Sequence, residues 1–435
     1  MRVIVAGGGL AGFTAALRAV ELGARTTLLE KGGLPGGSFL LSSGYAWSYR
    51  DLPTFRREAP GGDPGLQNLI LERLEPYIGW LERQGCPVLS RETGNPLTFG
   101  ARLDPEGTVG ALARRIADLG GEILPNTALD GLLNDTSGRV TGTRTNHGDE
   151  LAADAAILSS GGFAGNPELV SRHIIGGPGR MRLRSHPRST GDGFLAAQAV
   201  GARTSAGMDE FYGRNLPAPP AEFSPAEFVE VSQLYGRHAV AINTRGERYA
   251  DEGADWSETA LTRTTARQPG LRAWYVLDAA GLEGRVRERT AGEMVEAAKR
   301  AGGTVLETPT LEELAEALAK HGLPRDITLR TLREYNQAVA DGRGDELSPP
   351  RTGPAAPARV PPFVAVEVAP TITHTVGGLA VDERCGVLRL EDGGPIPGLY
   401  AAGVEVGGVS TGGYTSGLAA AVVFGRIAAE SSLGH

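Results

Sequence analysis

The chain has 435 residues, of which 41% are hydrophobic and 22% are charged, and its formal net charge is −8. This composition is typical of a globular protein of at least two domains, and a mildly acidic chain without Lys/Arg runs is not expected to bind nucleic acid. Two cysteines, Cys86 and Cys385, without a CxxC motif or a His/Cys cluster, predict neither a disulfide framework nor a metal site.

The N-terminal stretch predicts a strand, a glycine-rich turn, a helix and a second strand. Val3–Ala6 is a short apolar run, Gly7, Gly9 and Gly12 form GxGxxG, and the later strand "ARTTLLEK" ends at Glu30. In a dinucleotide-binding unit the glycines allow a tight turn, the approach of a pyrophosphate and close helix packing. The acid accepts the ribose hydroxyls and disfavours a 2′-phosphate. The motif therefore predicts FAD or NAD.

A second stretch rich in glycine and serine, "KGGLPGGSFLLSSGYAW", begins at Lys31. Its backbone N–H groups and hydroxyls suit the longer of the two cofactors, although a surface loop has the same composition. Here the sequence resembles the flavoprotein superfamily of fumarate reductases, 3-ketosteroid dehydrogenases and tricarballylate dehydrogenase, which carry a similar segment beside FAD. The contacts that this resemblance implies are Lys31, Gly37, Ser38, Ser43 and Gly44.

The next part of the chain predicts further elements of the same domain. We expect a helix over Thr108–Leu119, a strand at "GEILPN", a β-hairpin, and a buried strand "AAILSS". That strand leads to Gly161 and Gly162, which match a superfamily pattern where the chain returns to FAD. In the "STGDG" turn, Asp192 is expected to be a helix N-cap, a contact to the flavin, or both.

From about Ala206 the composition changes. Prolines cluster, a hairpin with its turn at Gly246 is expected, and two amphipathic helices precede a proline-rich linker. The sequence thus predicts an α/β fold, in which a Rossmann-like FAD-binding domain of parallel sheet and helices is interrupted by an α+β cap. The expected bounds are residues 1–205 and 354–435 for the FAD-binding domain and 206–353 for the cap, or substrate domain.

The C-terminal part carries fragments shared with the superfamily: "GGLAVD", "PIPGLYAAG" and "VFGR". The last helix, apolar all round, is expected to be buried. In the superfamily its N-terminus points at the pyrimidine end of the flavin, where the helix dipole and free N–H groups stabilise negative charge. The contacts implied here are Gly403, Glu405, Ser416 and Leu418.

The resemblance also implies a function for Tyr414. Fumarate reductases carry an arginine in this lead that holds a substrate carboxylate, whereas ketosteroid dehydrogenases carry a tyrosine that polarises a ketone with the help of a backbone N–H. Tyr414 matches the tyrosine, and Gly417 supplies the N–H. The histidine of the fumarate reductases is replaced by Thr373, next to His374, and their cap arginine by Leu282. The alternatives are that Tyr414 packs under the helix and that His374 is structural.

The general base is left open between several residues. Ketosteroid dehydrogenases use a cap tyrosine, and the corresponding position here is Trp256. The candidates are Tyr212, Tyr235, His238, Tyr45 and Tyr49.

We therefore expect an FAD-dependent oxidoreductase, with FAD bound non-covalently, that desaturates a small cyclic ketone by removal of the α-proton and transfer of the β-hydride to flavin N5. The alternatives are a carboxylate-specific dehydrogenase or ene-reductase, in which Arg214 or Arg237 binds the acid, and a non-catalytic FAD-binding subunit. No second GxGxxG occurs, so an external acceptor (oxygen, a quinone or a soluble carrier) is expected. No apolar run reaches the ~18 residues of a membrane span, and the chain begins directly with a strand, so we expect a cytoplasmic protein without a signal peptide.

Overall fold

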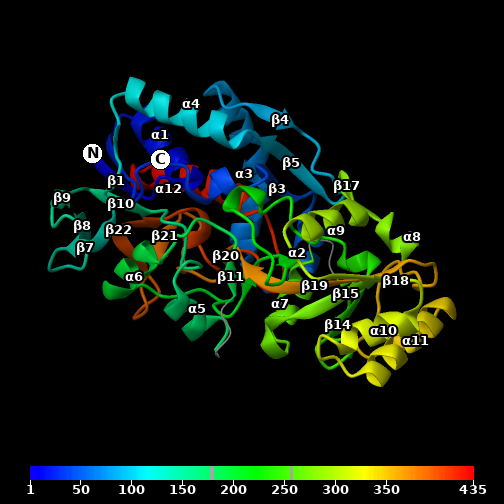
Figure 1. Cartoon of the computed structure of the whole chain (residues 1–435). Helices are drawn as coiled ribbons and strands as arrows, with labels where there is room; N and C mark the ends of the chain where they lie inside the picture. Colours follow the sequence, from blue (N-terminus) through cyan, green and yellow to red (C-terminus); the bar gives the residue numbers. More distant parts are fainter. Residues whose placement is uncertain (177–180, 255–257) are drawn as a thin grey trace. The chain divides into compact units, whose positions relative to one another are not determined.

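The computed structural model describes residues 1–176, 181–254 and 258–435, and the chain forms two compact units (Figure 1). The first unit comprises Met1–Gly176, Ser185–Phe211 and His374–His435, and the second comprises Gly177–Arg184 and Tyr212–Thr373. The predicted cap, residues 206–353, falls largely within the second unit, which extends twenty residues further, to Thr373. The assignment of these segments as an FAD-binding domain and a substrate-binding cap stays a prediction.

A six-stranded sheet forms the centre of the first unit. Its strands run in the order β21 (Gly386–Leu388), β22 (Pro395–Ala401), β10 (Ala155–Leu158), β1 (Arg2–Ala6), β2 (Arg25–Leu29) and β6 (Glu122–Leu124). All neighbours are parallel except β21 and β22. The apolar runs in β1 and β10 are buried, as expected for strands covered on both faces. The predicted Rossmann-like α/β fold is confirmed.

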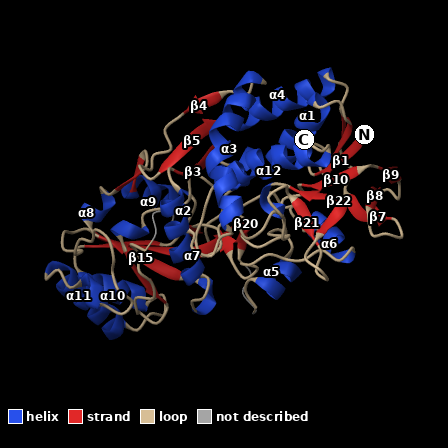
Figure 2. Ribbon diagram, turned by 180° about the vertical axis from the view of Figure 1, so that it is seen from behind, coloured by secondary structure: helices blue, strands red, loops and turns tan. Residues whose placement is uncertain are grey.

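Two buried helices, α1 (Leu10–Glu21) and α12 (Gly417–Ser432), pack against each other beside this sheet (Figure 2). They approach closely because α12 has a glycine at the contact: a Cβ added at Gly425 would lie 2.6 Å from the carbonyl oxygen of Ala11. Small residues make such an approach possible. The prediction of a last helix buried all round is confirmed.

The remaining elements of the first unit flank the sheet. The helices are α2 (Leu52–Glu58), α3 (Pro64–Arg83), α4 (Pro105–Asp118), α5 (Pro167–His173) and α6 (Asp192–Ala199). One antiparallel sheet consists of β3 (Tyr45–Tyr49), β5 (Thr98–Leu103) and β4 (Val88–Ser90), and the other of β7 (Leu129–Asn134), β8 (Val140–Thr145) and β9 (Glu150–Ala152). The predicted hairpin is β8–β9. The predicted helix over Thr108–Leu119 starts three residues earlier, because Pro105 is favourable in a first helical turn.

The second unit is built around β19 (Phe363–Ile372), a buried strand that pairs with β11 (Arg182–Leu183), β13 (Asn215–Pro217), β15 (Ala273–Leu277) and β18 (Val305–Thr308), while β14 (Val240–Asn243) pairs with β15. Side chains alternate between the two faces of a strand. Val364, Val366 and Val368 accordingly join a core with α9 (Ala291–Arg300), and Phe363 and Ala365 join a core with α10 (Leu311–Ala319) and α11 (Arg325–Ala340). This sheet is therefore covered on both faces.

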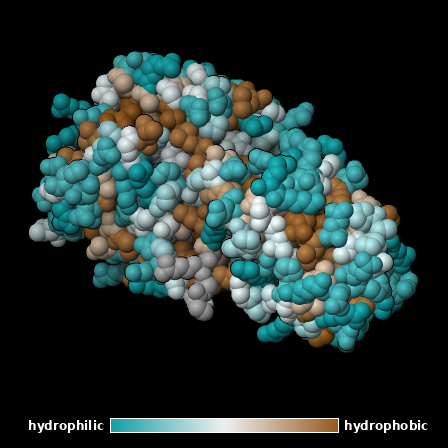
Figure 3. Space-filling model, viewed as in Figure 1, coloured by the Kyte–Doolittle hydropathy of each residue, from teal (hydrophilic) through white to brown (hydrophobic). Residues whose placement is uncertain are grey.

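The helices predicted to be amphipathic are α10 and α11, whose outer surface is mostly hydrophilic (Figure 3). The predicted turn at Gly246 is also present, since its N–H donates to the carbonyl oxygen of Asn243 (3.0 Å) and its φ is +74°. Beyond that turn the expected hairpin is reduced to a single bridge between Ile242 and Arg248. The other helices of this unit are α7 (Thr259–Thr265) and α8 (Ala279–Leu282).

Gly425→Ala tests the contact between α1 and α12. The added methyl group meets the carbonyl oxygen of Ala11 at 2.6 Å, so we expect a loss of about 1–3 kcal/mol in the free energy of unfolding. The matched control is Gly110→Ala in the exposed face of α4, where no heavy atom lies within 4 Å of the added Cβ and a gain of about 0.5–1 kcal/mol is expected. Denaturant unfolding measures both, and equal effects would contradict the close contact.

Candidate functional site

Four strands of the parallel sheet end at one edge of the first unit. Parallel strands point the same way, so the residues that follow β1, β2, β10 and β22 meet there, which is where open α/β sheets bind ligands. Backbone hydrogen bonds tie these ends together: Gly7 N–H donates to Leu29 (2.8 Å), Ser159 N–H to Ala6 (2.9 Å) and Ala402 N–H to Leu158 (2.8 Å). The predicted cofactor residues from both ends of the chain lie at this edge.

The three glycines of GxGxxG have different surroundings. A Cβ at Gly7 would lie 2.4 Å from the carbonyl oxygen of Ser159, and a Cβ at Gly12 would lie 1.8 Å from the carbonyl oxygen of Gly7. Both positions are therefore closed by the protein itself. At Gly9 no heavy atom lies within 4 Å of the added Cβ. Gly9 is the glycine that leaves room for a ligand at the N-terminus of α1, as a pyrophosphate requires.

Glu30 is buried and links two glycine-rich loops. One carboxylate oxygen accepts a hydrogen bond from Gly8 N–H (3.0 Å) and the other accepts one from Gly32 N–H. A carboxylate oxygen has two lone pairs, so each oxygen keeps one acceptor position for a ribose hydroxyl. Glu30 thus shapes the predicted site and stays a predicted ligand of the cofactor.

Lys31 and Asp192 form an ion pair, with 2.9 Å between Nζ and Oδ2, and Lys31 also donates to Thr190 Oγ1 (2.7 Å). Asp192 is the first residue of α6, whose N-cap is Gly191 and whose N-terminus receives no side-chain cap. The prediction of Asp192 as a helix N-cap is therefore wrong. Its carboxylate forms the ion pair that joins the loop after β2 to α6, and its contact with the flavin stays a prediction.

The glycine/serine lead approaches Gly9 at one position. Around a Cβ added at Gly37, the nearest heavy atom is Gly9 Cα at 3.8 Å, so the two glycines border the same open space. Ser38 Oγ accepts a hydrogen bond from the N–H of His186 (3.1 Å). Gly37 and Ser38 stay predicted cofactor contacts.

Ser43 and Gly44 join this lead to the antiparallel sheet. The carbonyl oxygen of Ser43 accepts a hydrogen bond from Arg102 Nε (3.2 Å). Gly44 has a φ of +79°, and a Cβ there would lie 2.1 Å from the carbonyl oxygen of Leu103. Gly44 is therefore required by the backbone of the protein, whatever else it contacts.

Glu405 is a buried carboxyl group on the turn after β22. Its Oε1 accepts hydrogen bonds from Ser160 Oγ and from Gly162 N–H (3.2 Å), and burial raises the pKa of this carboxyl group. Its Oε2 has no hydrogen-bond partner among the described residues. A buried polar atom normally has one, and a hydroxyl group of a bound ligand would satisfy it.

Gly161, Gly162 and Gly403 shape the same turns. Their φ values are +96°, +67° and +65°, which side chains rarely adopt. A Cβ at Gly403 would lie 2.8 Å from Ala11 Cβ, so this glycine lets the turn after β22 pack on α1.

The first turn of α12 presents free backbone donors. Ser416 is the N-cap: its Oγ accepts from Ala419 N–H (3.3 Å) and donates to the carbonyl oxygen of Tyr45 (2.8 Å). The N–H groups of Gly417 and Leu418 have no hydrogen-bond partner among the described residues. With the helix dipole, they form a site that favours negative charge.

Tyr414 and His374 lie beside this turn. The Tyr414 ring is buried, 5.6 Å from the ring of Trp47 and 6.1 Å from that of His374. His374 Nδ1 lies 3.0 Å from the carbonyl oxygen of Thr375, and its Nε2 would lie 3.1 Å from a Cβ added at Gly417. The structure thus brings three of the predicted catalytic residues together, Tyr414, His374 and Gly417.

The other three predicted catalytic residues belong to the second unit. Tyr235 is fully buried, its hydroxyl donates to Gln233 Oε1 (2.6 Å), and burial raises its pKa well above the ordinary value. A phenol held protonated in a core is unsuited to act as a base, so Tyr235 is withdrawn as a candidate. The ring of Tyr212 lies 5.0 Å from the Arg214 guanidinium. His238 is half-buried, with a pKa lowered by burial.

The two residues that replace fumarate reductase positions, Leu282 and Thr373, also lie in the second unit. Trp256, at the position of the ketosteroid dehydrogenase cap tyrosine, lies outside the described residues. Leu282 ends α8, and Thr373 Oγ1 accepts a hydrogen bond from Arg184 (3.2 Å). The carbonyl oxygen of Arg237 accepts one from Arg351 (2.7 Å).

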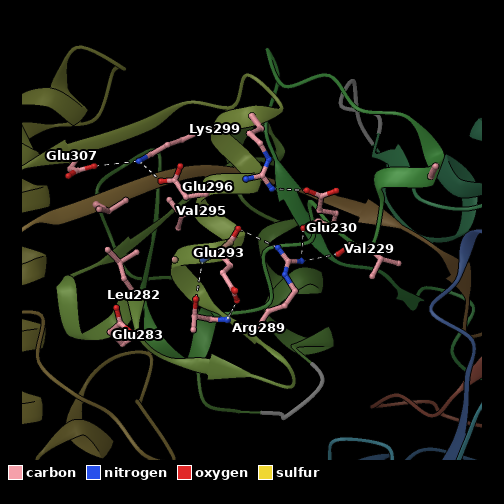
Figure 4. Close-up of a pocket in the computed structure, with 15 residues that line it drawn as sticks. Val229, Glu230, Leu282, Glu283, Arg289, Glu293, Val295, Glu296, Lys299 and Glu307 are labelled. Atoms are coloured by element: carbon pink, nitrogen blue, oxygen red, sulfur yellow. Dashed lines mark hydrogen bonds and ion pairs between the residues drawn. The ribbon is translucent and has the colours of Figure 1, made fainter. Parts of the chain in front are cut away.

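A pocket of about 950 Å³ opens around α9 in the second unit (Figure 4). Its charged side chains pair with one another: Lys299 with Glu296 and Glu307, and Arg300 with Glu230. None of the predicted catalytic or cofactor-binding residues lines this pocket, although Leu282, which replaces the cap arginine of the fumarate reductases, does. It is therefore not the predicted active site.

Two residues near the site were not predicted from the sequence as part of it. Ser160 donates to Glu405 and accepts from Gly193 N–H (3.0 Å), and thus joins β10, β22 and α6. Trp47 contacts the rings of Tyr414 and Tyr49. The available signal for Trp47 was the alternation of aromatic residues in "YAWSY".

Among the described residues, no helix is both long and apolar enough to cross a membrane. Within the same residues, no group of three or more His, Cys, Asp or Glu side chains could hold a metal ion.

Comparison with known proteins gives a family match over nearly the whole chain: the FAD binding domain matches residues 2–419. The chain is 26% identical over 477 residues to the probable fumarate reductase Ifc3 of Shewanella frigidimarina (strain NCIMB 400), covering 100% of this chain and 75% of the relative. It is 27% identical over 307 residues to 4-oxocyclohexanecarboxylate 2-dehydrogenase of Sinomonas cyclohexanicum, covering 64% of this chain and 51% of the relative. The solved 3-ketosteroid delta1-dehydrogenase of Sterolibacterium denitrificans shares the fold, with a TM-score of 0.78, 19% identity, and 99% of this chain and 98% of that chain covered.

Gly9→Ala tests the open space in the glycine-rich turn. No protein atom lies within 4 Å of the new methyl group, so the cofactor-free protein should keep its melting temperature. Because the methyl group occupies space needed for the cofactor, the Kd for the dinucleotide should rise about tenfold or more. Fluorescence titration of the cofactor-free protein measures this, with Gly110→Ala as control. An unchanged Kd would show that the ligand does not approach Gly9.

Glu405→Gln tests the buried carboxyl group. Since the pKa of Glu405 is raised in the folded chain, the folded state binds the proton more tightly than the unfolded state. The stability of the cofactor-free protein should therefore fall as the pH rises from about 4.3, the pKa of an unfolded-chain glutamate, through the folded pKa. Glu405→Gln removes this pH-dependent contribution to the free energy of unfolding, so the variant should be more stable than wild type at pH 8 but not at pH 4. Thermal unfolding across this range, with the exposed Glu391→Gln as control, measures the effect.

Proposed function

The chain belongs to the FAD binding domain family, and from that premise we propose that it acts on the bond between the α- and β-carbons of a small cyclic ketone. FAD is its cofactor, and it is an FAD-dependent oxidoreductase of the group of reductases and dehydrogenases that act on CH–CH bonds. The ketone and the use of Tyr414 to polarise it are the proposal.

The residues at the sheet edge fit FAD. Gly9 and Gly37 border an open space, Glu405 Oε2 is a buried acceptor without a described partner, and Gly417 and Leu418 have free N–H groups. These features suit, in turn, a pyrophosphate, a chain of hydroxyls, and a ring system that gains negative charge. When bound, FAD supplies the acceptor or donor of a hydride.

The observation that carries the proposal is Tyr414, a buried phenol beside the first turn of α12. By the sequence resemblance, it corresponds to an arginine of the fumarate reductases. A phenol donates one hydrogen bond and suits a neutral carbonyl oxygen, whereas a guanidinium suits a carboxylate. We assign the Tyr414 hydroxyl and a backbone N–H of the following turn to the ketone oxygen. Together they stabilise the charge that forms on this oxygen when the α-proton is removed.

The base that takes the α-proton is proposed to be Tyr212, His238 or Tyr45. The lowered pKa of His238 keeps its imidazole neutral, as a base requires, at pH values where it would ordinarily be protonated. His374, next to Tyr414, is proposed to orient the phenol or the substrate. The electron acceptor is proposed to be external: oxygen, a quinone or a soluble carrier.

Among the relatives, 4-oxocyclohexanecarboxylate 2-dehydrogenase bears the name of a cyclic ketone substrate and supports the proposal. The second candidate is a carboxylate-specific dehydrogenase or ene-reductase, which the fumarate reductase relative favours, with Arg214 or Arg237 of the proposed cap domain binding the acid. The third candidate, a non-catalytic subunit, is set aside because these relatives are themselves enzymes. Anaerobic bleaching of the flavin distinguishes the first two: cyclohexanones bleach it in the first, and only carboxylates in the second.

Tyr414→Phe tests the proposed electrophile. Loss of one donor to a developing oxyanion should lower kcat for the ketone about 10²–10³-fold, while the FAD content stays the same. Steady-state kinetics with a dye acceptor and the absorbance of bound flavin measure the two quantities. The control is Tyr400→Phe, which removes a hydroxyl bonded to the carbonyl oxygen of Ser431 (3.4 Å), at the far end of α12. Wild-type turnover in Tyr414→Phe would remove Tyr414 from the mechanism.

A further inference from the structure

We propose that Tyr49 is a positioning residue that acts through Tyr414. Its hydroxyl donates a hydrogen bond to the main-chain carbonyl oxygen of Tyr414 (3.0 Å), and both side chains are buried. This inference rests on the proposed function of Tyr414 and adds the group that fixes it in place. It also gives Tyr49, a candidate base in the sequence, a different role.

The position of the Tyr49 ring is fixed by its contacts with neighbouring aromatic rings. Strand β3 alternates its side chains, so Trp47 and Tyr49 lie on the same face. Trp47 stands at 90° to Tyr49 with 5.4 Å between ring centroids, and at 74° to Tyr414 with 5.6 Å. Phe55 of α2 packs on Tyr49 at 5.2 Å. Edge-to-face contacts of this kind orient rings, so the hydroxyl is held where it meets the carbonyl group.

The loop that leads to Tyr414 is held by further contacts along its length. The corner between α2 and α3 binds it through Gly61 N–H, which donates to the carbonyl oxygen of Thr411 (2.9 Å), and through Gln67 Nε2, which donates to that of Val409 (3.2 Å). The Glu210 carboxylate also accepts a hydrogen bond from Gly412 N–H of this loop (2.9 Å). Tyr49 continues this series at Tyr414 itself.

The hydrogen bond from Tyr49 has two physical consequences. First, it fixes the backbone from which the phenol projects, and a small misplacement of a catalytic group costs a large factor in rate. Second, the peptide whose carbonyl it polarises also carries the N–H of Thr415, which has no hydrogen-bond partner among the described residues. Hydrogen bonds in a chain strengthen one another, so Tyr49 makes this N–H a better donor. The first consequence acts on the position of the Tyr414 phenol and therefore on the rate.

The test is a double-mutant cycle on the FAD-loaded enzyme with Tyr49→Phe, Tyr414→Phe and the double variant, and with Tyr400→Phe as control. We expect Tyr49→Phe to lower kcat for a cyclohexanone about tenfold, with KM, FAD content and melting temperature close to wild type. In the Tyr414→Phe background, Tyr49→Phe should have no further effect, because it acts through the residue already removed.

The outcomes separate this inference from the proposed function. If Tyr414→Phe lowers kcat but Tyr49→Phe does not, or if the two losses multiply in the double variant, Tyr49 does not act through Tyr414 and the inference is overturned. If Tyr414→Phe itself keeps wild-type turnover, the proposed function fails first, and the inference with it.

A crystal structure of Tyr49→Phe gives a readout that is independent of turnover. The inference expects the carbonyl group of Tyr414 to turn or to become disordered while Trp47 and Phe55 stay in place. An unchanged, ordered Tyr414 would overturn it even if the rate fell.

Discussion

The first unit depends on one constraint, the close approach of backbones around α1. Three glycines that are far apart in the sequence make it possible. A Cβ at Gly12 would meet the carbonyl oxygen of Gly7 at 1.8 Å, one at Gly425 would meet that of Ala11 at 2.6 Å, and one at Gly403 would meet Ala11 Cβ at 2.8 Å. The helix is thus packed between the turn that precedes it, α12, and the turn after β22. This packing brings the C-terminal fifth of the chain to the N-terminal nucleotide motif.

Two buried carboxylates organise the edge that results. Glu30 accepts hydrogen bonds from the two glycine loops at the N-terminal side, and Glu405 accepts them from Ser160 and Gly162 after β10. Each therefore has a structural partner and remaining acceptor capacity. A residue that binds the protein with one lone pair and a ligand with another couples the fold to the cofactor. For this reason the stability of the loops and the binding of FAD are expected to depend on the same side chains.

The proposed catalytic part of the site is organised by contacts between aromatic rings. Strand β3 belongs to a small antiparallel sheet, yet its aromatic face meets the lead of α12, the last helix of the chain. A buried phenol beside the unpaired N–H groups of a helix N-terminus is a chemical arrangement suited to a neutral carbonyl. The second unit has its own sheet and two cores, one on each face of β19, and so folds around a separate set of apolar side chains.

Much of the first unit follows from local patterns. The GxGxxG turn, the acid at Glu30, the apolar strands and the last buried helix were all predicted, because glycine conformations, hydrophobic periodicity and residue spacing are local properties. Other features depend on contacts between distant segments: the ion pair between Lys31 and Asp192, the burial that raises the pKa of Tyr235, and the hydrogen bond from Tyr49 to Tyr414. The sequence determined which residues could serve each purpose. Only the tertiary structure decided which of them lie together and which are buried in a core, because burial and hydrogen-bond partners arise from packing between segments that are distant in the sequence.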